Sequence, residues 1–214
     1  MSAYSPAHER ANVITHLIGF VFGLVALPWV LIRAYGNAGV NGEWILGLGL
    51  YSIGFLMVFG FSSLYHFYQQ PARKTLMKMW DHISIYYLIA GTFTPFIMAY
   101  GQPPSSHYFL MWLWSIALAG TVFKIFFTGR YRLISTALYV AMGWMVLFAP
   151  HPFKENLPDD QFFWIAVGGA SYTIGVIFYL VKKIPYHHAI WHVFVLGGAL
   201  CHFIGIWRMV ENAV

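Results

Sequence analysis

Long apolar stretches alternate with short polar connections along the whole chain. Seven windows have the length, about 20 residues, that an α-helix needs to cross a bilayer, and they are Val13–Ile32, Trp44–His66, Ile83–Tyr100, Tyr108–Phe127, Leu133–Pro150, Phe162–Val181 and His188–Trp207. The connections between them are mostly 5–16 residues long, too short for a separate soluble domain. The pattern predicts an all-α membrane protein, a seven-transmembrane helix bundle that forms one domain over residues 1–214.

Composition supports the membrane interpretation. Hydrophobic residues make up 59% of the chain and charged residues only 9%, whereas soluble domains carry about 25% charged residues. The first apolar window is longer than the hydrophobic region of a typical secretion signal, and no small-x-small cleavage pattern follows it. We therefore count it as a membrane span.

The distribution of basic residues indicates orientation. The net charge is +5, and nine of the twelve Lys and Arg residues fall on the amino-terminal side of the predicted bundle: Arg10, Arg73, Lys74, Lys78, Lys124, Arg130, Arg132, Lys182 and Lys183. The positive-inside rule makes that side cytoplasmic. We expect a multi-pass protein of the inner (plasma) membrane, with the N-terminus inside and the C-terminus outside. Basic residues spread over alternate connections indicate no nucleic-acid site and no soluble protein partner, and Lys124 is expected to extend its ammonium group to the interface.

Two histidines open the last apolar window. His188 and His192 are four residues apart, so on a helix their rings share one face and can hold one ion. His202 lies on roughly the same face, but ten residues correspond to about 15 Å of rise, which is too far for it to join His192 on one metal. Ionisable side chains inside a span face the bundle interior or water and indicate function.

A polar face opens the first window as well. Glu9, Asn12 and His16 are spaced three and four residues apart and share one helical face. Each has a simpler explanation: an acid in the first turn favoured by the helix dipole for Glu9, and interhelical hydrogen bonds for the other two.

The ends of the second and third windows add further polar groups. Ser62 and His66 share a face at the end of the second window, where a lone histidine is usually an interfacial hydrogen-bonding group. Asp81 and His82 come directly before the third window, and Asp81 is placed to cap that helix. His82 points about 100° away from Asp81, as a supporting or interfacial residue.

Topology brings these groups to one depth. The first, third and last helices begin on the cytoplasmic side and the second ends there, so all these polar groups except His202 lie near one boundary. Three imidazoles with an open fourth position are the composition of a catalytic zinc site. We predict Zn2+ held by His66, His188 and His192, with Asp81 receiving the proton of a water and Ser62 hydrogen-bonding the water or substrate. Glu9, Asn12, His16, His82 and His202 would support this site.

Five stretches carry a resemblance to a known family: ANVITHLIG, SSLYH, DHISIYYLIAGTFTPF, YVAMGW and IPYHHAIWHVFVLGGALCHF. They resemble the hemolysin III family, within the progestin and adiponectin receptor superfamily. The resemblance implies a seven-helix bundle that holds zinc near the cytoplasmic face through His66, His188 and His192. Asp81 and Ser62 match the neighbouring carboxylate and serine positions. Similarity of the wider superfamily to alkaline ceramidases implies hydrolysis of lipid amides, and the bacterial branch is linked to lipid and energy homeostasis.

Three functions remain open from the sequence. The first is a zinc-dependent hydrolase of a lipid amide or ester, with a membrane lipid as substrate. The second is a non-catalytic sensor or regulator in which zinc stabilises the bundle. The third is a haemolytic pore, which is disfavoured because the ionisable residues gather at one depth instead of lining a path.

Overall fold

The computed structural model describes residues 5–213, and every regular element in that range is helical. In chain order the elements are α1 (Pro6–Tyr35), α2 (Gly42–Phe67), α3 (Pro71–Tyr100), α4 (Ser105–Phe127), α5 (Arg132–Gly143), the 3-10 helix η1 (Met145–Phe148), α6 (His151–Asn156), α7 (Asp159–Leu180) and α8 (His187–Glu211). The expectation of an all-α protein is confirmed over this range.

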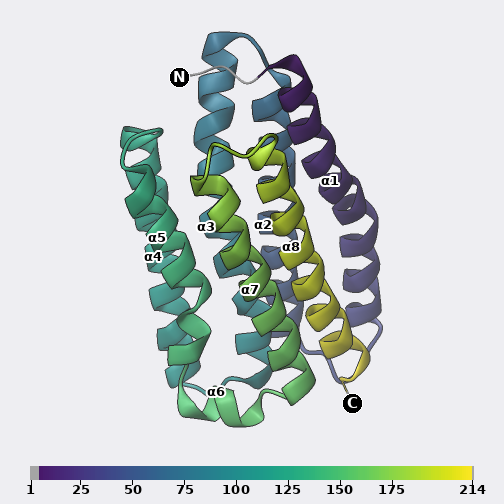
Figure 1. Ribbon diagram of the computed structural model, residues 1–214. Helices are drawn as coiled ribbons and strands as arrows, with labels where there is room; N and C mark the ends of the chain where they lie inside the picture. Colours follow the sequence, from purple (N-terminus) through teal and green to yellow (C-terminus); the bar gives the residue numbers. More distant parts are fainter. Residues whose placement is uncertain (1–4, 214) are drawn as a thin grey trace.

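The long helices run side by side along one common direction (Figure 1). Helix α1 packs on α2 and on α8, α2 packs on α3, and α3 packs on α4 and α5. Helices α5 and α7 are in contact, and α7 packs on α8, which closes the ring. The two termini lie at opposite ends of the bundle (Figure 1).

Within residues 5–213, six helices are long and apolar enough to cross a membrane: α1, α2, α3, α4, α7 and α8. Their outward faces carry large apolar side chains, such as Val25, Ile32 and Ile53, that no other helix covers. Burying such surface in lipid is favourable, as it is in a protein core. The structure is therefore that of a multi-pass membrane protein.

The predicted fifth span, Leu133–Pro150, is not one long helix in the structure but two shorter ones. Helix α5 has only 12 residues and ends at Gly143, and the four-residue helix η1 follows Trp144. Glycine is a poor residue for continuing a helix, and the indole Nε1 of Trp144 donates to Thr173 Oγ1 of α7 at 3.0 Å. The break is thus tied to a specific contact with α7. Helix α6 then occupies the connection between the fifth and sixth predicted windows.

Helix α3 begins at Pro71, twelve residues before the apolar window Ile83–Tyr100 that the sequence predicts. Pro71 occupies its first turn, where the missing N–H of proline costs nothing and its fixed φ favours the helix. The basic segment after Pro71 is therefore helical and not a loop. Asp81 lies in the third turn of α3, so it cannot cap the start of the helix.

Lys124 also departs from expectation. Its side chain does not extend to the interface but is buried at 1% exposure. The ammonium Nζ donates to Ser135 Oγ of α5 at 2.6 Å. The contact holds the ends of α4 and α5 together.

Helices α2 and α3 pack closely around the middle of α2. A Cβ placed on Gly54 would lie 2.5 Å from the carbonyl oxygen of Tyr87, and one on Gly91 would lie 2.8 Å from that of Leu50. Small residues at such crossings let helix backbones approach closely. The approach fixes α2, which carries His66, against α3, which carries Asp81.

Candidate metal centre

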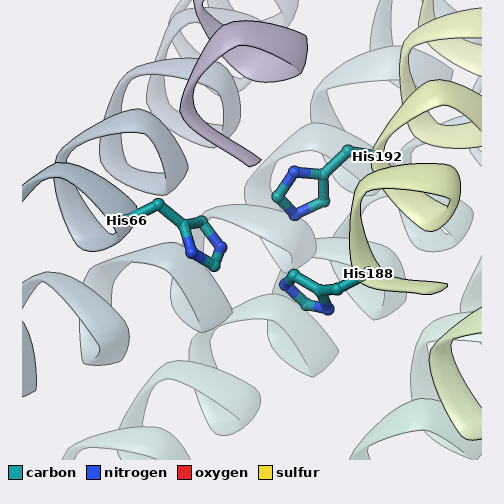
Figure 2. A group of neighbouring side chains, drawn as sticks. All are labelled: His66, His188 and His192. Atoms are coloured by element: carbon teal, nitrogen blue, oxygen red, sulfur yellow. The ribbon is translucent and has the colours of Figure 1, made fainter. Parts of the chain in front are cut away.

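Three histidine rings from two helices point toward one another at one end of the bundle. His66 comes from the last turn of α2, and His188 and His192 come from the first turns of α8 (Figure 2). One ring nitrogen from each lies within 4.8 Å of the other two. His66 and His192 are buried and His188 is half-buried. The two histidines of α8 and the histidine at the end of α2 thus lie together, as the sequence indicated.

The ring of His66 is oriented by an acid from α1. Its Nδ1 lies at hydrogen-bond distance, 2.6 Å, from Glu9 Oε2, and the side-chain amide of Asn12 packs beside that nitrogen at 3.3 Å. The other carboxylate oxygen of Glu9 accepts from Lys74 Nζ at 2.7 Å. A carboxylate accepts hydrogen bonds only, so Nδ1 of His66 carries the proton and Nε2 keeps its lone pair.

The ring of His192 is oriented in the same way by α1. Its Nδ1 lies 3.3 Å from the carbonyl oxygen of Asn12 and 3.2 Å from Thr15 Oγ1. The carbonyl again accepts only, which places the proton on Nδ1 and the lone pair on Nε2. Helix α1 therefore fixes the tautomer of two rings that belong to two other helices.

These contacts test whether the residues fit a metal. Histidines that bind metals characteristically donate their second N–H to a carboxylate or a backbone carbonyl, and both arrangements occur here. Three imidazole nitrogens close to one point suit zinc, with bonds of about 2.0–2.1 Å, after small side-chain rotations. The donor set fits a zinc ion with three protein ligands, and these histidines can hold one.

Two buried polar groups beside the cluster lack a hydrogen-bond partner among residues 5–213. Ser62 Oγ, one turn before His66, is one of them, at 1% exposure. The second is the imidazole of His16, neither of whose nitrogens has a partner in that range. Its ring centroid lies 3.7 Å from that of His192. Unsatisfied buried polar groups are costly, and both side chains are available to hydrogen-bond a bound polar group.

Asp81 and His82 line a cavity that His188 also lines. The group of side chains able to share one ion, among the described residues, does not include Asp81. The ring of His82 is turned to its own helix, with Nδ1 2.6 Å from the carbonyl oxygen of Lys78. Asp81 therefore lies in the wall of the cavity and not among the three clustered histidines.

His202 lies apart from the cluster. Its Nε2 is 3.2 Å from the carbonyl oxygen of Ile165, and a Cβ on Gly168 would lie 2.3 Å from the same nitrogen. The ring fills the space left by Gly168 and joins α8 to α7. His202 also lines the cavity that His188 lines, so its supporting role stays a prediction.

Sequence reasoning missed two residues of the site. Thr15 follows Asn12 by three residues, so the helical spacing that grouped Glu9, Asn12 and His16 also places Thr15 close to that face. Lys74 was assigned only to the charge bias of the cytoplasmic side. Its ion pair with Glu9 depends on α3 beginning at Pro71, a boundary that the apolar pattern did not show.

Comparison with known proteins identifies the family of the chain. Residues 4–203 match the family described as "Haemolysin-III related". The chain is 41% identical over 198 residues to the hemolysin-3 homolog of Bacillus subtilis, covering 91% of each chain. It is 39% identical over 197 residues to the hemolysin-3 of Bacillus cereus, covering 91% of this chain and 88% of the relative.

A more distant relative is human. The monocyte to macrophage differentiation factor of Homo sapiens is 28% identical over 177 residues, which cover 79% of this chain and 71% of the human protein. The family match extends over nearly the whole chain and includes all three clustered histidines. This membrane protein belongs to the haemolysin-III related family.

Proposed function

We propose that the protein is a zinc-dependent hydrolase of a lipid amide or ester, with zinc held by His66, His188 and His192. The observation that carries the proposal is the orientation of His66 by Glu9 at 2.6 Å. An acid buried in a membrane helix is costly unless it is paired, and this acid sets the tautomer that a metal ligand needs.

The cavity next to the histidines supplies the place for a substrate. It has a volume of about 450 Å3 and is lined by His188, Asp81 and apolar side chains such as Ile89 and Trp191. Zinc in such a site supplies a Lewis acid for a carbonyl oxygen and lowers the pKa of a water to about 7. Asp81 accepts the proton of the attacking water, and Ser62 orients that water or the substrate oxygen.

The proposal includes an orientation in the membrane. The chain crosses seven times, with α5 and η1 together forming the crossing between α4 and α7. The N-terminus is cytoplasmic, the C-terminus is outside, and the site lies near the cytoplasmic face of the inner membrane. Support comes from the termini at opposite ends of the bundle (Figure 1) and from the basic residues gathered at the N-terminal end.

Metal analysis of protein purified without chelators is the first test. We expect about one zinc per chain, and little zinc in the His188→Ala variant. Fewer than about one zinc per ten wild-type chains would contradict the proposal.

Turnover is tested separately with Asp81→Asn. Under the hydrolase proposal, the variant keeps its zinc and loses hydrolysis of a lipid amide by about 100-fold or more, the usual size of a general acid–base contribution. Retained hydrolysis with zinc in place would remove Asp81 from the mechanism.

A second candidate is a regulator of membrane state in which zinc has no catalytic role. It is favoured by the position of the histidines, since α2 and α8 both pack on α1 and a shared ion would join them. In this case Asp81→Asn leaves the cellular function intact, while loss of a histidine ligand lowers stability. The same variant thus separates the two functions.

A further inference from the structure

The cavity beside the histidines has an apolar interior and a strongly basic lining. Apolar side chains from five helices form much of its wall, among them Val58, Leu88, Val140, Val176 and Val195. Its volume of about 450 Å3 falls within the range of small-ligand sites. The cavity can therefore hold an apolar chain beside the metal centre.

The charged residues of the lining are markedly unbalanced. Asp81 is the one carboxylate among the described residues that line the cavity, against five basic side chains: Lys78, Lys124, Arg130, Arg132 and Lys182. The five come from α3, from the inner ends of α4 and α5, and from the connections that follow α4 and α7. Elements far apart in the sequence thus bring cations to one cavity.

Lys124 is the cation whose burial bears most directly on what the cavity binds. It is 1% exposed, and its ammonium donates to Ser135 Oγ at 2.6 Å. No ion pair between described side chains includes Lys124, and the nearest aromatic rings, Phe123 and Tyr139, have centroids 5.9 Å away. A buried ammonium without an anionic partner is strongly unfavourable, and an anion bound in the cavity would offset that cost.

The excess of basic residues on the predicted cytoplasmic side does not account for the burial of Lys124. A lysine that only reports topology extends its ammonium into water at the interface, as the exposed Lys183 does at the same end of the bundle. Lys124 instead directs its charge into a protein cavity. Arg132, also in the lining, stacks on Tyr179, with the guanidinium carbon 5.4 Å from the ring centroid, and it has no carboxylate partner among the ion pairs of residues 5–213.

We propose that Lys124, together with Arg130 and Arg132, forms an anion-binding subsite, and that the ligand of the cavity is an amphiphile with a phosphate or carboxylate headgroup. The headgroup binds at Lys124 and the apolar chain extends between α3, α5 and α7. This inference rests on the proposed function in one respect, that the cavity admits a lipid, and it adds the charge of the headgroup.

Binding of matched amphiphiles tests the inference without any turnover. Palmitate, palmitoyl lysophosphatidic acid and uncharged monopalmitoylglycerol carry the same chain, and their binding to purified protein in a neutral detergent is measured by native mass spectrometry. We expect the two anionic ligands to bind about tenfold or more tightly than the neutral one, because a hydrogen bond to a charged group is worth at least this factor. Equal affinity of all three for the wild type overturns the proposal.

Variants locate the effect. Lys124→Met should bring the affinities of anionic and neutral ligands to within about threefold of each other, whereas the matched control Lys183→Met should keep the wild-type preference. An equal loss in both variants would show a general surface-charge effect and would overturn the subsite. If Lys124→Met does not yield folded protein, Arg132→Gln serves as the second variant. It leaves the buried lysine in place and should partly reduce the preference for anionic ligands.

Two further arms separate related possibilities. Inorganic phosphate alone should bind far more weakly than the phosphate amphiphile, and equal binding would show a site for free phosphate and overturn the lipid. Zinc content of the wild-type protein is measured separately. Absence of zinc would contradict the proposed function, whereas the headgroup preference alone decides this inference.

Discussion

Glu9 illustrates how one residue links three helices at the histidine cluster. Its two carboxylate oxygens accept from His66 of α2 and from Lys74 of α3, while Glu9 itself belongs to α1. An acid in the first turn of a helix also gains from the helix dipole. The dipole alone explains an exposed acid, but Glu9 is buried and directed at a ring nitrogen.

The first prediction therefore concerns Glu9→Gln. Removing the carboxylate partner of a metal-binding histidine typically lowers metal affinity about 10–100-fold. We expect the dissociation constant for zinc to rise by this factor, measured by competition with a chromophoric chelator. Glu43→Gln is the matched control, because Glu43 is an exposed acid in the first turn of α2, far along that helix from His66. An affinity of Glu9→Gln within twofold of the control would mean that Glu9 only pairs with Lys74.

Residue chemistry made much of the cluster predictable from the sequence. The spacing of His188 and His192 specifies a shared helical face, and the apolar windows specify the depth of His66. The role of Glu9 was not specified, because its partners come from α2 and α3 and only the packed structure shows which one it contacts. Lys124 was misjudged for the same reason: a lysine at a span end looks alike in sequence whether it faces lipid or a cavity.

At the scale of the element, the crossing of α2 and α3 depends on two glycines. Gly54→Ala would place a Cβ 2.5 Å from the backbone oxygen of Tyr87, and a backbone atom cannot move aside as a side chain can. The helices must separate, and we expect a loss of about 1–3 kcal/mol in the free energy of unfolding, measured by denaturation in mixed micelles.

Gly49→Ala serves as the control for that variant. Gly49 lies in the same helix, with no atom within 4 Å of an added Cβ. Alanine should then leave stability unchanged or raise it slightly, since it favours the helical conformation. Equal losses in both variants would show that the α2–α3 contact is looser than these distances indicate.

The elements themselves were predictable to different degrees. Helices α1, α2, α4, α7 and α8 follow the apolar windows because membrane burial dominates their sequence. The start of α3 was not predictable in this way, since Pro71 sets it within a basic segment that hydropathy reads as a connection. Helix α5 ends early because Gly143 and the contact of Trp144 with α7 interrupt an apolar run.

At the scale of the whole molecule, a shared ion would connect α2 to α8 and close the ring of helices. Ligand binding to the folded state alone raises stability by about 2.7 kcal/mol when free zinc is about 100 times the dissociation constant. For a chain of this size, that corresponds to about 5–10 °C in the melting temperature. We expect a strong chelator to lower the wild-type melting temperature by this amount in a thermal-shift assay.

Histidine variants show whether the chelator acts through this site. His66→Ala should melt at the lower temperature already and should not respond to the chelator. His107→Ala, an exposed histidine near the start of α4, should respond as the wild type does. A chelator effect that persists in His66→Ala would place the stabilising metal elsewhere on the protein.

The crossing number of the chain is tested by the sides on which its ends lie. If only the six long helices cross the membrane, the two ends of the chain lie on the same side. If α5 and η1 form a further crossing, the two ends lie on opposite sides, which matches their positions at opposite ends of the bundle (Figure 1). In a Cys201→Ala background, Ala213→Cys should react with a membrane-impermeant maleimide in intact cells. Arg73→Cys, at the start of α3, should react only after permeabilisation. Labelling of both positions in intact cells would show an even number of crossings, and the reverse pattern would place the histidine cluster on the outer face.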